Sequence, residues 1–148
     1  MRLDGFFLCE YARPDAGGGF TAVNAGWSTW NVGEPVPPPP EGGPAPAAVI
    51  SASVVARLLL TPEESDGGHQ LALRLLDADG GELFRGDVQL IGQRDPELPR
   101  SWEQQMLLVL PLVGFPLPSF GLYRIELERP GDPVPLGACP FQVIKRYA

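Results

Sequence analysis

Frequent glycine and proline residues are the feature that most limits how this chain can fold. The sequence has 148 residues, of which 18 are glycine and 18 are proline. No stretch of about 12 residues free of both keeps an apolar period of 3.6, and the best helical candidate is the short segment 101–107. We therefore expect strands and turns with almost no helix.

Apolar side chains recur at every second position in six segments of the chain after residue 50. This period is typical of a strand that turns one face to an apolar interior. The segments are 54–60, 71–75, 84–90, 108–112, 123–127 and 139–143. Turn clusters rich in Gly, Pro and Asp separate them, and strands joined without helices predict an antiparallel two-sheet sandwich of about 7 to 8 strands.

A proline-rich segment divides the early part of the chain from these six strands. Seven prolines occupy the twelve positions from Pro35 to Pro46. In polyproline II geometry twelve residues span roughly 37 Å, which is long enough to carry the chain from one sheet to another. We interpret the segment as a connecting loop, and the alternative is a proline-rich ligand for an aromatic groove.

The chain is expected to form one domain, residues 1–148. Residues 1–34 are predicted to form an N-terminal hairpin of two strands joined at 14–19, residues 35–47 the proline-rich connection, and residues 48–148 the remaining strands. The first of the two early strands carries apolar groups on both faces. A strand covered on both sides and a strand at an oligomer contact both fit this pattern.

The charge balance limits the partners that we expect. A formal net charge of −7 disfavours nucleic acid and anionic membrane surfaces, which require clustered Lys and Arg. Asp4 interrupts the apolar run before Cys9, so the N-terminus does not fit a lipoprotein signal. We expect a cytoplasmic protein whose two cysteines, Cys9 and Cys139, are reduced and packed as small apolar side chains.

Residues suited to catalysis or metal binding are few. Asp77, Asp79 and Glu82 could offer oxygen ligands, but their Asp-Gly-Gly context is a strong hairpin signal and lacks the rest of a calcium loop. His69 is the only histidine, which weakens acid-base and nucleophilic schemes. We therefore predict no catalytic residues, no metal site and no cofactor.

Three tryptophans are the candidate partner-binding residues: Trp27, Trp30 and Trp102. An exposed indole can stack on a sugar ring or anchor a protein partner. If Trp27 and Trp30 shared one regular strand, they would point to opposite faces, and one of them would lie inside. Packing in the core or at a sheet edge is the simpler role for all three.

The end of the chain resembles the last hairpin of immunoglobulin-like and fibronectin-like bacterial modules. A glycine precedes Tyr123, an alternating strand and a turn follow, and the motif Pro-Phe-Gln-Val closes the stretch. The resemblance implies that Tyr123 is a tyrosine-corner residue bonded to backbone near 117–120, with Phe141 and Val143 as structural residues of the last strand.

The opening of the chain resembles an uncharacterised family of small bacterial proteins that begin with a strand ending in an acidic residue, Tyr and Ala. Here the triplet is Glu10, Tyr11 and Ala12. This resemblance implies a sandwich fold and no known activity.

The sequence thus favours a protein that is not an enzyme: a binding or assembly module for an unidentified protein partner, with a second copy of the chain as one candidate partner. The support is the missing catalytic set and the apolar residues near 3–30. Two alternatives stay open, a carbohydrate-binding module that uses an exposed tryptophan and an enzyme of unidentified class that uses carboxylates.

Overall fold

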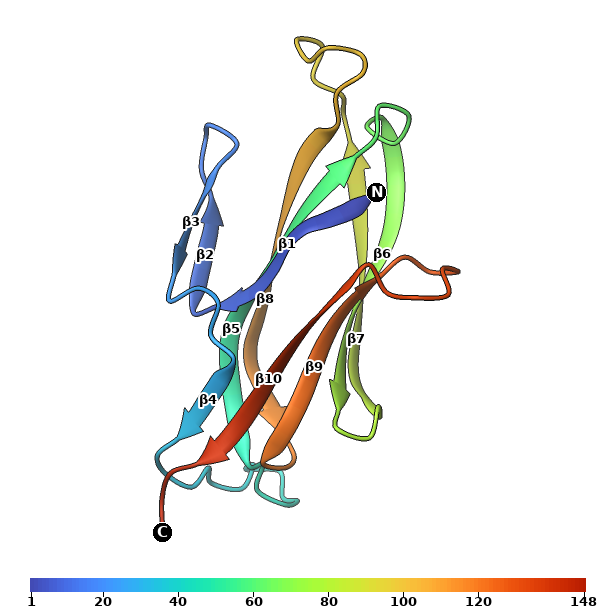
Figure 1. Cartoon of the computed structure of the whole chain (residues 1–148). Helices are drawn as coiled ribbons and strands as arrows, with labels where there is room; N and C mark the ends of the chain where they lie inside the picture. Colours follow the sequence, from blue (N-terminus) through green and yellow to red (C-terminus); the bar gives the residue numbers. More distant parts are fainter.

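The computed structural model describes all 148 residues and contains ten β-strands and no helix (Figure 1). The strands are β1 (Arg2–Cys9), β2 (Tyr11–Pro14), β3 (Phe20–Val23), β4 (Thr29–Val32), β5 (Ala48–Leu60), β6 (Gly67–Asp77), β7 (Glu82–Gly92), β8 (Gln104–Leu117), β9 (Gly121–Glu128) and β10 (Gly137–Lys145). The predicted all-β class is confirmed, with more strands than expected. The structure has no helix long and apolar enough to cross a membrane.

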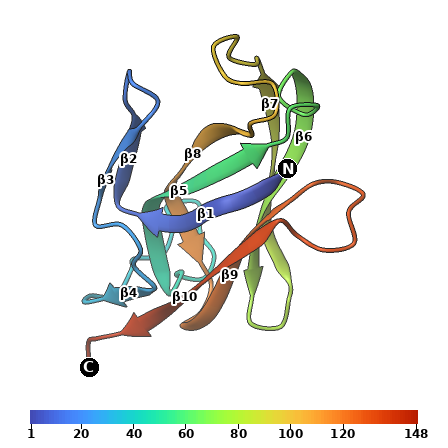
Figure 2. The same ribbon diagram turned by 45° about the horizontal axis from the view of Figure 1, so that its top comes forward.

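The strands form three sheets. One sheet has three strands in the order β1-β5-β8, a second has five in the order β4-β10-β9-β6-β7, and the hairpin β2-β3 forms a third. All neighbouring strands are antiparallel except β4 and β10, which are parallel. Figures 1 and 2 show the two larger sheets as facing layers, with β2 and β3 standing to one side.

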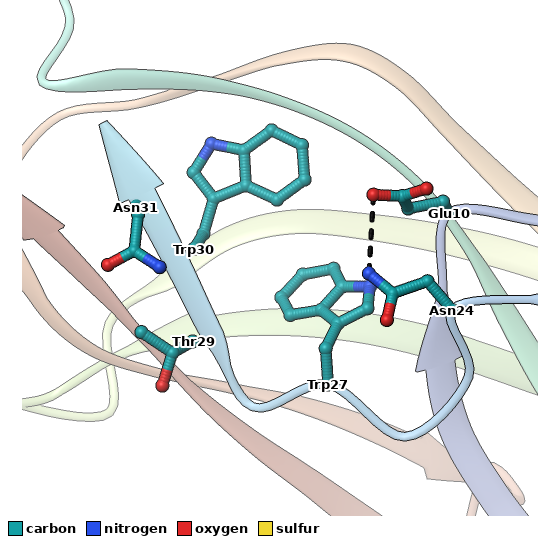
Figure 3. A pocket seen from close by; sticks show the side chains of 6 residues that line it. All are labelled: Glu10, Asn24, Trp27, Thr29, Trp30 and Asn31. Atoms are coloured by element: carbon teal, nitrogen blue, oxygen red, sulfur yellow. Dashed lines mark hydrogen bonds between the residues drawn. The ribbon is translucent and has the colours of Figure 1, made fainter. Parts of the chain in front are cut away.

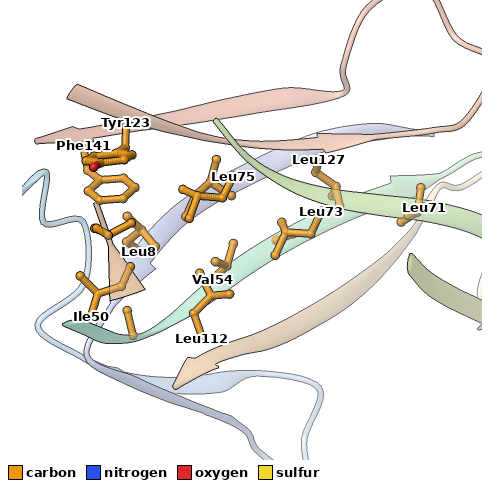
Figure 4. Close-up of a cluster of buried hydrophobic side chains, with 14 of the residues drawn as sticks. Leu8, Ile50, Val54, Leu71, Leu73, Leu75, Leu112, Tyr123, Leu127 and Phe141 are labelled. Carbon is orange, nitrogen blue, oxygen red and sulfur yellow. The ribbon is translucent and has the colours of Figure 1, made fainter. Parts of the chain in front are cut away.

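The two larger sheets share one apolar interior. A single cluster of 20 buried residues draws members from both, including Leu8 and Val54 from one sheet and Leu127 from the other (Figure 4). The predicted alternation is confirmed, because Leu73 and Ile125 are buried and Leu110 packs against the same cluster. Each large apolar side chain removed from water contributes roughly 1.5–3 kcal/mol, so this cluster is the main stabilising element.

Three residues of the last two strands form one end of this interior. The ring of Tyr123 stacks on that of Phe141 with centroids 5.5 Å apart, and Val143 is buried beside them. The hydroxyl of Tyr123 donates to the carbonyl of Ser119 at 2.7 Å, which lies within the backbone stretch named from the sequence. The bond fixes the turn between β8 and β9 to the start of β9.

The first 34 residues are arranged differently from the predicted hairpin of two long strands. Only β2 and β3 pair with each other, whereas β1 pairs with β5 and β4 pairs with β10. The reason is the two-sided apolar character of β1. Leu8 enters the main interior, while Cys9 on the opposite face packs in a smaller cluster under Ala12 and Phe20 of the β2-β3 hairpin.

The proline-rich residues 33–47 form no strand and connect β4 of the five-stranded sheet to β5 of the three-stranded sheet. Their path runs along the lower end of the molecule in Figure 1. The amide of Ala47 donates to the carbonyl of Leu117 at 2.8 Å, which fastens the end of the segment to the strand that neighbours β5. A role as a ligand for another protein stays the alternative to the predicted connecting role.

Replacement of Tyr123 by Phe should lower the free energy of unfolding by about 1 kcal/mol, because the polar backbone of Ser119 loses its partner. Urea denaturation followed by circular dichroism measures the change. Tyr147→Phe is the matched control, since the Tyr147 ring packs on Phe120 and its hydroxyl forms no hydrogen bond in the structure. Equal stability of the Tyr123→Phe variant and the wild type would show that the corner bond does not stabilise the fold.

Candidate functional site

Trp27 and Trp30 lie next to each other, and Trp27 joins them to the stacked rings of Phe141 and Tyr123. Their ring centroids are 5.5 Å apart with planes tilted by 51°. Trp27 also meets Phe141 edge to face, with centroids 5.9 Å apart. The two predicted structural residues Tyr123 and Phe141 therefore support the indole pair from the inside.

The two indoles do not point to opposite faces of a strand. β4 begins at Thr29, so Trp27 lies in the loop before the strand and strand alternation does not apply to it. Gly26 holds this loop, because its amide donates to the carbonyl of Leu8 at 2.7 Å. Asn24 in the same loop has φ of 49°, a left-handed conformation that asparagine adopts more readily than most residues.

β4 is positioned by the far end of the chain. Trp30 is paired with Val143 and Thr29 with Gln142 in the parallel β4-β10 ladder. The side-chain amide of Gln142 also donates to the hydroxyl of Thr29 at 3.2 Å. The position of Trp30 thus depends on β10.

The indole pair lines a surface pocket of about 300 Å³ together with four polar side chains (Figure 3). These are Glu10, Asn24, Thr29 and Asn31. Figure 3 shows Asn24 and Glu10 on one side of the indoles and Thr29 and Asn31 on the other. The Asn24 Nδ2 atom donates to Oε1 of Glu10 at 3.2 Å, and the Asn31 Oδ1 atom accepts from Nε of Arg146 at 2.9 Å.

One atom in the wall of this pocket is unsatisfied. The indole nitrogen Nε1 of Trp27 is buried and has no hydrogen-bond acceptor, and it is the only buried side-chain nitrogen or oxygen in this state. Burying a donor without an acceptor lowers the stability of the fold by roughly 1–3 kcal/mol. Native proteins contain few such donors. The unsatisfied donor belongs to an indole that lines the pocket and also packs against the main interior.

Trp102 lies away from the other two tryptophans, in the loop between β7 and β8 at the top of Figure 1. Its side chain is 60% exposed. Arg94 orders the loop by donating from Nη2 to the carbonyl of Trp102 at 3.0 Å and to that of Pro99 at 2.7 Å. Trp102 is therefore a single exposed indole, separate from the pocket of Trp27 and Trp30.

A second hollow lies on the outer face of the three-stranded sheet, between that sheet and the β2-β3 hairpin. It measures about 500 Å³ and is lined by β2 with parts of β5 and β8, including Tyr11, Val109 and Val113. The sequence predicted that the early apolar residues lie in a covered strand or at an oligomer contact. It did not indicate that residues of β8 line the same surface. We refer to this hollow and the surface around it as the outer apolar face.

Two of the three acidic residues considered for metal binding, Asp77 and Glu82, have structural roles. Asp77 accepts backbone N–H groups of Asp79 at 3.0 Å and Gly81 at 2.7 Å, which closes the turn between β6 and β7. Glu82 accepts from Arg74 at 2.7 Å. The structure has no group of three or more His, Cys, Asp or Glu side chains that could hold a metal ion. Nε2 of His69 lies 2.7 Å from the carbonyl of Glu64.

The fold and the pockets describe an all-β protein of two facing sheets with an aromatic pocket at one edge. Residues 4–144 match the model of a family of unknown function, DUF6941. The chain belongs to this family. A search of curated proteins finds no match.

The two cysteines are free and lie on different sides of the three-stranded sheet. Cys9 is fully buried under the hairpin and its thiol lies 3.5 Å from the carbonyl of Ser53, while Cys139 is half-buried against the main interior. Burial raises the pKa of both thiols above the ordinary value of 9.0. A raised pKa leaves less of the reactive thiolate at neutral pH.

Both thiols should therefore react with a bulky disulfide reagent much more slowly in the native protein than in urea, with Cys139 faster than Cys9. The native rate should continue to rise above pH 9, because the folded pKa values lie higher. Absorbance of the released thiol measures the rate, and Cys139→Ser isolates Cys9. Rapid native labelling of the Cys139→Ser variant would contradict the burial of Cys9.

Proposed function

We propose that the protein is a non-catalytic binding or assembly module and that the outer apolar face is its contact surface. The observation that supports this proposal is the difference between the outer faces of the two large sheets. One face carries a network of ion pairs, and the other carries apolar side chains that the β2-β3 hairpin covers only in part.

The outer face of the five-stranded sheet is suited to water. Arg74 lies 2.7 Å from Glu82 and 3.3 Å from Glu128, and Arg85 lies 2.7 Å from Glu128. The hydrogen bond to Glu82, reinforced by Glu128, raises the pKa of Arg74 above its ordinary value. Charged residues of both signs on a sheet face are typical of a solvent-exposed surface.

The outer face of the three-stranded sheet is apolar around the hairpin, and the ion pair of Arg57 with Asp4 lies farther along the same face. Val55 is fully buried under the hairpin, and Phe7 packs on Phe20 with ring centroids 6.0 Å apart. The apolar surface continues from this cluster into solvent, where Val113 of β8 is 79% exposed and Tyr11 at the start of β2 is 54% exposed. Apolar surface that continues from a cluster into an open hollow is typical of a protein contact site.

We propose a second copy of the chain as the occupant of this face. The rim of the hollow carries Glu10 and Arg13, and a twofold contact can pair these opposite charges reciprocally. β8 hydrogen-bonds only to β5, so the backbone along its other side is open where the two copies would meet. A different protein partner is the alternative occupant.

The finer description of the fold and its setting belongs to the same proposal. The Tyr123 hydroxyl bond to Ser119 supports an immunoglobulin-like or fibronectin-like sandwich of bacterial type. Two free cysteines and an acidic net charge of −7 support a cytoplasmic location without nucleic acid or membrane partners. The hydrogen-bonded roles of Asp77 and Glu82 favour a binding role over an enzyme that uses them.

Sedimentation velocity at tens of micromolar should show a dimer of the wild type and a monomer of the Val113→Asp variant. A carboxylate placed in an apolar contact should raise the dissociation constant at least tenfold, equal to about 1.4 kcal/mol. Ile91→Asp is the matched control, because Ile91 is 73% exposed but lies on β7 of the other sheet.

Two results would contradict self-association through this face. The first is a wild type that stays monomeric at every concentration, which would leave a different protein as the partner. The second is dissociation of the Ile91→Asp variant to the same extent as Val113→Asp, which would place the contact elsewhere. Circular dichroism of both variants checks that the fold is intact.

A further inference from the structure

We propose that the pocket of Trp27 and Trp30 binds one residue of a neutral saccharide. This inference does not rest on the assembly proposed above, because β4 and the loop before it carry the two indoles, and Glu10 is the one residue that borders both hollows. The argument comes from the shape of the aromatic wall, the hydrogen-bonding groups around it and the charge of the site.

The aromatic wall matches the apolar face of a sugar ring. The two indoles are tilted by 51° with centroids 5.5 Å apart, so they form an angled wall and not a flat patch. Trp27 is held from behind by Phe141, and Trp30 is held by the pairing of β4 with β10. A pyranose presents C–H groups on its faces and hydroxyl groups on its rim, so its face can pack on an indole.

The polar rim offers both donors and acceptors to sugar hydroxyls. The hydrogen bond from Asn24 leaves the carbonyl oxygen of Asn24 and one carboxylate oxygen of Glu10 free as acceptors. The bond that Asn31 accepts from Arg146 leaves the Asn31 amide free as a donor and fixes its orientation. Because a hydroxyl both donates and accepts, this mixed set suits it.

The size and charge of the site favour a neutral ring over other small ligands. A volume of about 300 Å³ lies at the lower end of ligand pockets and accommodates a single ring unit. The negative charge of the Glu10 carboxylate would repel an anionic ligand. A quaternary ammonium ion would stack on the indoles, but it would leave the amides of Asn24 and Asn31 without partners.

The Nε1 atom of Trp27 is buried and unsatisfied, and the ring that carries it lines the pocket. A sugar ring stacked on this indole would alter the surroundings of the buried N–H. Binding therefore should change the environment of the Trp27 N–H directly.

The test follows the three indole N–H signals by two-dimensional NMR while methyl glycosides and their disaccharides are added into the tens of millimolar. Glucose, galactose, mannose and N-acetylglucosamine derivatives serve as probes. One of them should shift the Trp27 and Trp30 signals in a saturable manner and leave Trp102 unchanged. Trp102 is a suitable internal reference because it is 60% exposed in a different loop.

Variants separate binding from folding. Trp30→Ala should abolish saturable binding, whereas Trp102→Ala should leave it unchanged. Because Trp30 also packs against the interior, Asn31→Ala provides a milder change at an exposed residue and should weaken binding at least threefold. Trp30→Ala should retain the oligomeric state of the wild type, and Val113→Asp should retain saccharide binding. A failure of the saccharide proposal can therefore be told apart from a failure of the assembly proposal.

Three results would overturn the inference. The first is the absence of any saturable shift with all the glycosides, and the second is an equal shift of all three indoles. The third is saturable binding of tetramethylammonium at Trp27 and Trp30 with none of the saccharides, which would assign the pocket to a cation.

Discussion

The burial of β5 on both faces is the constraint on which the rest of the structure depends. Along 52–56 every residue of this central strand is buried, with Val54 turned to the main interior and Val55 turned the other way. A strand with two apolar faces needs a layer on each side. The five-stranded sheet supplies one layer, and the short β2-β3 hairpin supplies an incomplete second one. The incomplete cover creates the outer apolar face.

The late part of the fold could be predicted from the sequence because its information is local. In strands such as β6 and β9 the alternation of apolar and polar residues fixes which side faces inward, and Leu73 and Ile125 follow it. The turn at 77–81 likewise closes through Asp77 as its residues indicate. Such patterns need no knowledge of which strand lies beside which.

The early part of the fold and the pocket could not be predicted in the same way. The predicted long hairpin is divided because β1 pairs with β5 and β4 pairs with β10, and neither pairing leaves a local signal. Trp27 and Trp30 converge because one lies in a loop and the other in a strand, which alternation cannot reveal. A signal was nevertheless present: Asn24 and Gly26 before Trp27 indicate a turn there.

The parallel ladder between β4 and β10 joins residues 29–32 to residues 142–145. Closing so long a loop costs conformational entropy before any contact is gained, so pairings of this kind tend to form late in folding. During synthesis Trp30 lacks its neighbouring strand until residues 142–145 have emerged. The aromatic pocket thus depends on both strands, and its occupancy would distinguish a chain that contains residues 142–145 from a fragment that ends before them.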